Sequence, residues 1–274
     1  MVKKWVIKSE DAIQNKTRSY MERVLGGAVP KCGSEKQYQA QELYFEAMET
    51  GDINLIFQAL EIDPGNTECH LKLLSVLDAP DTEKIEMVQQ ILKIAEKRLG
   101  KAVFKECKGD FWLIFETRPY MRARSTLAWW LLKTGRIAES IAEHEGMLEL
   151  NPGDNQGIRY GLLGLYLQEN RIKDAARLLK EFKDERSCSA VMAWGYVLER
   201  FLTGKLDVAA KALDVARKQN GYVEAYLKGH RKLPKESVGC YSHGSREEAQ
   251  LCAELQKPAW DVHPEAIKWL ENSK

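Results

Sequence analysis

Apolar residues recur at helical spacing over much of the chain. A clear run lies between residues 172 and 182 and consists of Ile172, Ala175, Ala176, Leu178, Leu179 and Phe182. Spacings of three and four place these side chains along one side of an α-helix, where they can pack against a neighbouring element. Similar segments alternate with short polar turns, so the pattern predicts an all-α fold.

The predicted helices recur in pairs. Two windows of the chain, residues 121–154 and 190–223, share one plan: paired core residues, a turn glycine and then a small residue. The plan is filled by Leu127, Ala128, Gly135 and Ser140 in the first window, and by Tyr196, Val197, Gly204 and Ala209 in the second. A left-handed residue ends the first helix, and a small residue lets the two helices approach closely. The segment between the windows follows the same plan with Asn170 at the turn. These positions are similar to the tetratricopeptide repeat (TPR) pattern.

Weaker versions of the plan extend the repeats toward the N-terminus. Residues 37–66 and 67–100 each read as two helices joined by a polar turn. We therefore predict a TPR-like α-solenoid of about five helical hairpins over residues 37–221. After this point the pattern changes, and residues 222–274 are predicted to form a helical segment that caps the exposed apolar end of the stack.

The first 36 residues are locally basic. They contain eight Lys or Arg and four Asp or Glu, a local charge of +4. We predict a basic N-terminal arm over residues 1–36, partly helical or mobile, with one helix around residues 11–25. This arm supports an alternative function, a regulatory or nucleic-acid-associated module. The whole chain has 41 Lys or Arg and 40 Asp or Glu, so its net charge of +1 provides no global attraction for nucleic acid.

Composition and length are those of an ordinary folded protein. The 274 residues are 44% hydrophobic and 30% charged, which excludes intrinsic disorder, a collagen-like chain and a disulfide miniprotein. Six isolated cysteines without a C-x-x-C pair indicate reduced thiols. The N-terminus lacks the apolar core of a signal peptide, and no apolar run reaches the roughly 18 to 20 residues of a membrane span. We expect a cytoplasmic protein that is not anchored to a membrane.

Two phrases of the sequence are distinctive. Residues 116–124 (ETRPYMRAR) and 150–160 (LNPGDNQGIRY) resemble a group of bacterial TPR proteins of uncharacterised function. Phrases of the tail, such as residues 223–229 (VEAYLKG), are similar to the C-terminal part of the suppressor-of-tumorigenicity-7-like proteins. The resemblance covers roughly residues 110–270. It implies a helical-repeat scaffold for protein interaction, with no activity to transfer.

The chain shows no enzyme signature. His144-Glu145 begins like the zinc-protease motif H-E-x-x-H, but Leu148 stands where the second histidine is needed. A phosphate-binding loop G-x-x-x-x-G-K-[ST] and a G-x-S-x-G nucleophile turn are both missing from the sequence. We expect no catalytic activity and no cofactor. One metal-binding alternative stays open, because the tail contains four residues of zinc-ligand type: Cys240, His243, Cys252 and His263.

Candidate binding residues follow from the predicted solenoid. The first helix of each repeat lines the concave side of such a stack, where a peptide or a partner helix can bind. The residues predicted to face this groove are Arg122, Ser125, Trp129, Lys133, Asn155, Gln156, Arg159, Tyr160 and Trp194. Trp129 and its neighbour Trp130 cannot both point inward, so one is expected to be exposed. We predict a protein or peptide partner with acidic and apolar residues, in an unknown oligomeric state. The alternative is that these arginines cap helices or pair with neighbouring acidic residues of the protein itself.

Overall fold

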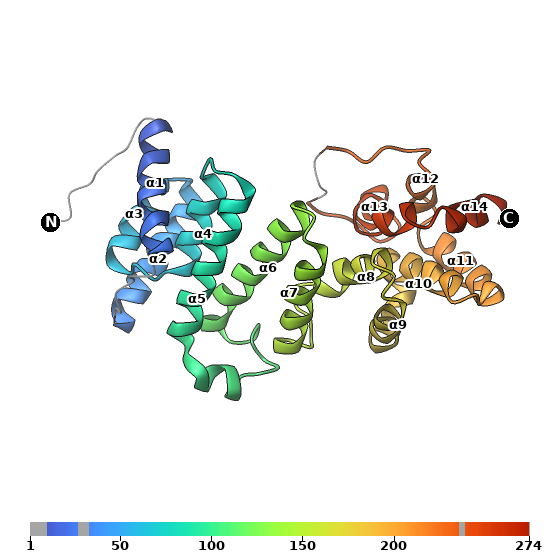
Figure 1. The fold of residues 1–274 in the computed structure, drawn as a ribbon, viewed down its shortest axis with the longest axis horizontal. Coiled ribbons are helices and arrows are strands. Elements are labelled where there is room, and N and C mark those ends of the chain that lie inside the picture. Colours follow the sequence, from blue (N-terminus) through green and yellow to red (C-terminus); the bar gives the residue numbers. More distant parts are fainter. Residues whose placement is uncertain (1–9, 27–32, 236–238, 274) are drawn as a thin grey trace. The chain divides into compact units, whose positions relative to one another are not determined.

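The computed structural model describes residues 10–26, 33–235 and 239–273. All the regular elements over these residues are helices, so the prediction of an all-α fold is confirmed (Figure 1). The chain divides into two compact units, unit 1 (residues 1–155) and unit 2 (residues 156–274). Within the described residues, no helix is both long enough and apolar enough to cross a membrane.

Unit 1 is built from helices that pair with their neighbours in the chain. Its elements are α1 (Glu10–Leu25), α2 (Ser34–Thr50), α3 (Ile53–Ile62), α4 (Thr67–Val76), α5 (Asp81–Glu106), the short 3-10 helix η1 (Phe115–Thr117), α6 (Arg118–Lys133) and α7 (Ile137–Leu150). Helices α2 and α3, α4 and α5, and α6 and α7 pack as three hairpins. Helix α6 also packs on α4 and α5, which joins the second hairpin to the third.

The turn between α6 and α7 shows why the hairpin plan is readable from sequence. Gly135 adopts a φ of 76°, in the left-handed region that glycine enters without steric cost. Across the helix pair, the hydroxyl of Ser140 donates a hydrogen bond of 2.8 Å to the carbonyl oxygen of Ala128. Both residues are buried, so the pair predicted at the helix crossing is the pair that meets there.

Helix α1 is a packed element of unit 1. It contacts α4 and α5, and the ring of Tyr20 stacks on Phe57 with centroids 5.6 Å apart. Gln14 holds the end of α4 by donating to the carbonyl oxygen of Val76 and accepting from the backbone N–H of Asp78. The helix predicted near residues 11–25 is therefore present and docked. The rest of the predicted arm, residues 1–9 and 27–32, lies outside the described residues.

Helix α5 is longer than expected. The sequence predicts that it ends at Gly100, and this residue does leave helical geometry, with a φ of 77°. Helical backbone then resumes and continues to Glu106. The glycine therefore makes a kink where an end was predicted.

Unit 2 contains two more hairpins and the helices of the tail. Its elements are α8 (Ile158–Gln168), α9 (Ile172–Glu181), the 3-10 helix η2 (Lys183–Ser187), α10 (Ala190–Leu202), α11 (Leu206–Gln219), α12 (Val223–Leu227), α13 (Arg246–Asp261) and α14 (Pro264–Asn272). Helices α8 and α9 form one hairpin, and α10 and α11 form the next. Asn170 takes a φ of 56°, which is the left-handed turn predicted for it.

The tail packs on the first helices of both unit 2 hairpins. Helix α13 contacts α8 and α10, and α14 also contacts α10 (Figure 1). Trp194 of α10 and Trp260 of α13 are fully buried, with ring centroids 6.4 Å apart. The sequence predicts that these first helices line an open binding groove. In unit 2 that prediction is wrong because α13 covers them.

Candidate functional site

The predicted stripe on α6 is present in unit 1. Trp129 is 55% exposed while its neighbour Trp130 is buried, so the prediction that only one of the two faces the core is confirmed. Arg122 and Lys133 are exposed and Ser125 is half-buried. These four residues follow one another at helical spacing, on the side of α6 turned away from the buried Leu127.

An ion pair joins this stripe to α4. The guanidinium of Arg122 binds the carboxylate of Glu68, whose side chain is only 5% exposed. The guanidinium also lies over the ring of Trp112, 5.5 Å from its centroid. A buried carboxylate is costly without a cationic partner, so Arg122 stabilises the contact between α4 and α6. The alternative prediction, that these arginines pair with acids of the protein itself, therefore describes Arg122.

Helix α2 extends the same surface with aromatic rings. Burial, followed by the nearby carboxylate of Glu68, which accepts its hydrogen bond, raises the pKa of the Tyr44 hydroxyl to about 12. The ring of Tyr44 lies 5.7 Å from that of Phe45, which is 57% exposed. Tyr38 and Met48 on the same helix are exposed as well. We name the surface formed by Tyr44, Phe45, Glu68, Trp112, Arg122 and Trp129 the α2–α4–α6 face.

Lys133, the last residue of α6, lies at one end of this surface. Its ammonium group is 3.0 Å from the carboxylate of Asp81, at the start of α5. It also lies 5.4 Å from the centroid of Trp129 and 4.6 Å from that of Trp130. The cation thus fixes the position of the exposed indole ring, because it is attracted both to the carboxylate and to the two ring faces.

Sequence reasoning missed the contribution of α2 and α4 to this surface. A signal was present in α2, where Tyr38 and Phe45 are seven residues apart and Met48 follows three residues later. Such spacing places apolar side chains on one side of a helix. Nothing in the sequence shows that this side lies next to Arg122, because α2 and α6 are far apart along the chain.

Unit 2 uses two of its predicted groove residues internally. The guanidinium of Arg159 donates to the carboxylate of Glu185, at 2.9 Å, and lies over the ring of Tyr160. The hydroxyl of Tyr160 donates to the same carboxylate at 2.8 Å. Burial, followed by this hydrogen bond to Glu185, raises the pKa of Tyr160 to about 12. Arg159 and Tyr160 therefore hold η2 against α8.

The prediction that Trp194 faces a groove is wrong. Its side chain is fully buried under α13, and its indole N–H donates to the carbonyl oxygen of Asn220 at 3.3 Å. Of the remaining predicted residues, Asn155 is exposed, whereas Gln156 is half-buried with a buried side-chain oxygen that has no hydrogen-bond partner. The structure thus gathers Arg122, Ser125, Trp129 and Lys133 on one surface of unit 1. In unit 2, Arg159, Tyr160 and Trp194 make contacts within the protein.

The four possible zinc ligands of the tail do not come together. Cys252 is fully buried in α13, Cys240 is exposed, and the ring of His263 is hydrogen-bonded to the carbonyl oxygen of Leu167 at 3.1 Å. His243 is exposed, near the carboxylate of Glu248. Within the described part of the chain, no three His, Cys, Asp or Glu side chains form a group that could bind a metal ion.

No protein-family model matches the chain, and no curated protein matches it either.

Proposed function

We propose that the protein is an interaction module that binds an extended or helical segment of a partner protein on the α2–α4–α6 face of unit 1. In this proposal the helical hairpins form a TPR-like stack, and the first helices of the unit 1 hairpins supply the binding surface. The resemblance of residues 116–124 and 150–160 to bacterial TPR proteins favours the same function.

One observation carries the proposal. Phe45 and Trp129 are both more than half exposed, and a series of contacts leads from Phe45 to Arg122, on the same helix as Trp129. Tyr44 lies against Phe45 and is hydrogen-bonded to Glu68, and Glu68 is paired with Arg122, two turns before Trp129 on α6. Large exposed aromatic residues arranged around a fixed arginine are typical of the residues that dominate binding energy at protein interfaces. In unit 2, by contrast, α13 already covers the corresponding helices.

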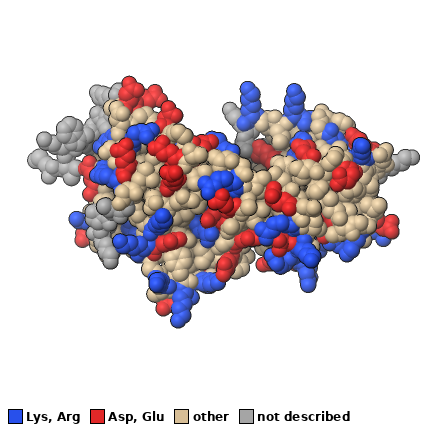
Figure 2. Space-filling view, in the orientation of Figure 1, with Lys and Arg blue, Asp and Glu red and all other residues tan. Residues whose placement is uncertain are grey.

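The charges of α4 and α6 on this surface favour an acidic partner, whereas α2 carries the exposed Glu42 and Glu49 at helical spacing from Phe45. Arg122 neutralises Glu68, so that carboxylate does not repel an approaching acid. Arg118 lies one turn before Arg122 on α6, and Lys72 lies one turn after Glu68 on α4. Neither Arg118 nor Lys72 has an acidic partner among the described residues. Elsewhere both signs of charge are interspersed over the visible surface (Figure 2). We therefore propose a segment in which acidic residues alternate with apolar ones.

Selection of binding peptides from a displayed random library with the full-length protein tests this proposal. We expect the selected peptides to combine Asp or Glu with large apolar residues. Trp129→Ala and Phe45→Ala should each weaken binding of a selected peptide by about tenfold or more, because the loss of an aromatic anchor typically costs about 2 kcal/mol. Both side chains are more than half exposed, so neither substitution removes a core residue.

Val208→Ala and Leu206→Ala are matched controls. Both residues are exposed apolar residues of α11, outside the α2–α4–α6 face, and their truncation should leave peptide binding unchanged. Peptides that bind Trp129→Ala and Phe45→Ala as tightly as the original protein would show that this surface is not the binding site. Selection of peptides without acidic residues would contradict the proposed partner chemistry.

A further inference from the structure

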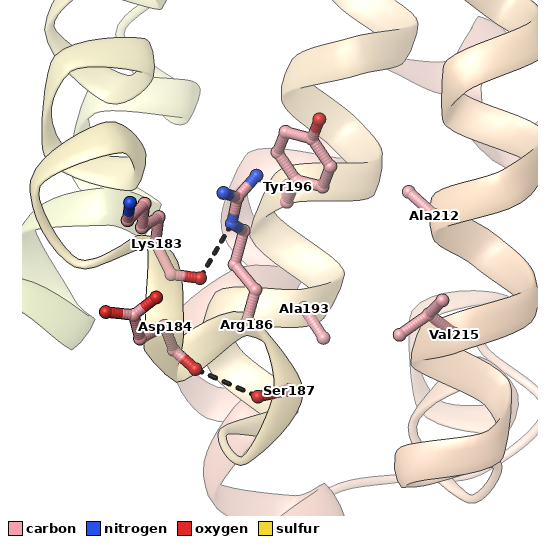
Figure 3. A pocket seen from close by; sticks show the side chains of 8 residues that line it. All are labelled: Lys183, Asp184, Arg186, Ser187, Ala193, Tyr196, Ala212 and Val215. Atoms are coloured by element: carbon pink, nitrogen blue, oxygen red, sulfur yellow. Dashed lines mark hydrogen bonds between the residues drawn. The ribbon is translucent and has the colours of Figure 1, made fainter.

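Unit 2 contains a surface hollow that the proposed function does not use. It has a volume of about 350 Å³ and lies between η2, α10 and α11 (Figure 3). One side is formed by η2 with Lys183 and Arg186, and the opposite side by α11 with Ala212 and Val215. Ala193 and Tyr196 of α10 lie between them. All of these residues belong to unit 2, so the hollow is defined within one compact unit.

The hollow combines an apolar side with a cationic one. Ala193, Ala212 and Val215 offer only methyl groups, and Val215 is 52% exposed. Facing them, Arg186 and Lys183 come from the same turn of η2. The carboxylate of Asp184, the one acidic residue that lines the hollow, points away from Arg186 in Figure 3. A ligand that fits both sides needs an apolar group next to a negative charge.

Arg186 is held in position but has no acidic partner. Its Nε donates to the carbonyl oxygen of Lys183 at 3.0 Å, and its guanidinium lies 4.5 Å from the centroid of the Tyr196 ring. Among the described residues, no carboxylate forms an ion pair with it. Arg200, which lies 5.2 Å from the same ring, is different because it is paired with the buried carboxylate of Glu199.

The contrast between the two arginines indicates the ligand. A guanidinium that is already oriented by an aromatic ring loses little conformational freedom when it binds a carboxylate, and its paired N–H groups match both carboxylate oxygens. The charge of Arg200 is used within the protein, and that of Arg186 is available at the edge of an apolar hollow.

We propose that this hollow is a second binding site, which accepts an acidic peptide segment. The carboxylate of an Asp or Glu side chain pairs with Arg186, and the side chain of a neighbouring apolar residue packs between Tyr196 and Val215. The volume suits one such pair of side chains, at the small end of the range for ligand pockets. The site is independent of the α2–α4–α6 face, so either can be present without the other.

Titration of the full-length protein with the probe acetyl-Phe-Glu-Leu-amide tests this site. Binding is followed by NMR signals of Tyr196 and Val215, with acetyl-Phe-Gln-Leu-amide as the uncharged counterpart. We expect the Glu peptide to bind at least about tenfold more tightly than the Gln peptide, because only its charge can form the assisted hydrogen bonds. Arg186→Gln should remove this preference, and Arg186→Lys should restore part of it.

Two further variants keep the test decisive if Arg186→Gln does not fold. Val215→Glu places a negative charge on an exposed position and should abolish binding of the Glu peptide, whereas Arg177→Gln is the control. Arg177 is an exposed arginine of α9 that is paired with Asp174 and does not line the hollow.

The proposal would be overturned if the two peptides bound with equal affinity, or if Arg177→Gln and Arg186→Gln lost equal affinity for the Glu peptide. It would likewise be overturned if the Tyr196 and Val215 signals did not shift at millimolar peptide. Binding of 3-phenylpropionate without binding of the Glu peptide would also overturn it, by showing a site for small organic acids.

Discussion

Gly164 of α8 lies directly against the backbone of Leu255 in α13. A Cβ atom at residue 164 would collide with the carbonyl oxygen of Leu255, which belongs to a helix backbone and cannot rotate away. The missing side chain of this glycine therefore determines how closely α13 packs on α8.

Gly164→Ala is expected to lower the stability of the protein. Alanine favours an isolated helix by up to about 1 kcal/mol, so local propensity alone predicts stabilisation. Overpacking of a filled interface typically costs about 1 to 3 kcal/mol, and here the obstacle is backbone. We expect the second effect to dominate. Urea unfolding followed by circular dichroism measures the change in the free energy of unfolding.

Gly146→Ala is the matched control for this change. Gly146 lies in the interior of α7, and the atoms nearest to a Cβ there would be those of the Arg124 guanidinium, the end of a long side chain that is paired with Glu143. We expect no loss, or a small gain in stability from helix propensity. If Gly164→Ala is as stable as Gly146→Ala, α13 does not pack on α8 as closely as described.

The hairpins could be predicted because their signals are local. A left-handed residue at a turn, such as Gly135 or Asn170, and a small residue such as Ser140 at a crossing act within about 20 residues of sequence. The position of α13 depends on contacts between residues far apart. An amphipathic tail helix can cover any apolar surface, and the sequence does not show which one. For this reason the sequence alone places Trp194 in a groove, whereas the structure buries it under α13.

The candidate site was predictable only along one helix. Periodicity placed Arg122 and Trp129 on one side of α6, and the structure agrees. The acid that pairs with Arg122 is 54 residues away in the sequence, and the aromatic rings of α2 are farther still. Opposite charges are abundant in this chain, so a pair such as Glu68 and Arg122 cannot be identified before the helices are placed.

We expect His70 to lower the stability of the protein in mild acid. Its ring is buried in α4, Nε2 is 2.8 Å from the carbonyl oxygen of Pro64, and Nδ1 has no hydrogen-bond partner. Burial lowers the pKa of His70 to about 4. The folded state disfavours the charged ring, so a neutral His70 contributes to the free energy of unfolding. This contribution is fully present above the unfolded-state pKa of about 6.5 and is lost as the pH falls toward 4. The expected loss is roughly 3 kcal/mol at pH 4.

His70→Gln separates this effect from the titration of carboxylates. An amide nitrogen can still donate to Pro64, but it takes up no proton in this pH range. Urea unfolding at several pH values should show a weaker decline between pH 6.5 and 4 in the variant than in the original protein. His230→Gln, at a solvent-exposed histidine, is the control and should keep the original slope. Equal slopes in all three proteins would contradict the burial of a neutral ring at residue 70.

The pair formed by Arg122 and Glu68 should show strong coupling. Arg122→Ala leaves the buried carboxylate of Glu68 without its cation, which we expect to cost about 1 to 3 kcal/mol of unfolding free energy. Combining it with Glu68→Gln should recover part of that loss, because the amide carries no charge. A double-mutant cycle measures the coupling, and the folded double variant then shows whether Arg122 also contributes to peptide binding.

The control for this cycle is an exposed pair in the same unit. Arg136 binds Glu139 three residues later on the surface, and both side chains are at least 40% exposed. Arg136→Ala should leave the free energy of unfolding almost unchanged, since exposed pairs contribute little. A coupling energy between Arg122 and Glu68 no larger than the effect of Arg136→Ala on the free energy of unfolding would contradict the burial of Glu68.

Asn220 joins the end of α11 to the start of α13 through a buried network. Its side-chain N–H₂ donates to the carbonyl oxygen of Ser245 at 2.8 Å and to the carboxylate of Glu248 at 2.9 Å. Glu248 also accepts from the backbone N–H of Gly244 and is only 3% exposed. Asn220→Asp would replace this donor with a second carboxylate, so two negative charges would meet in a buried site.

We expect Asn220→Asp to lower the free energy of unfolding by more than about 2 kcal/mol at neutral pH. Asn220→Ala only leaves the hydrogen-bond partners of Asn220 unpaired, and it should cost about 1 to 3 kcal/mol. The Asp variant should recover stability relative to the original protein as the pH is lowered, because a protonated carboxyl can donate to Glu248, whereas the Ala variant should not. Thermal unfolding of both variants between pH 7 and 5 distinguishes the two cases. Asn272→Ala, at an exposed residue of α14, controls for the loss of an ordinary surface hydrogen bond. An Asp variant as stable as the original protein at pH 7 would mean that α13 is not attached to α11 through Glu248.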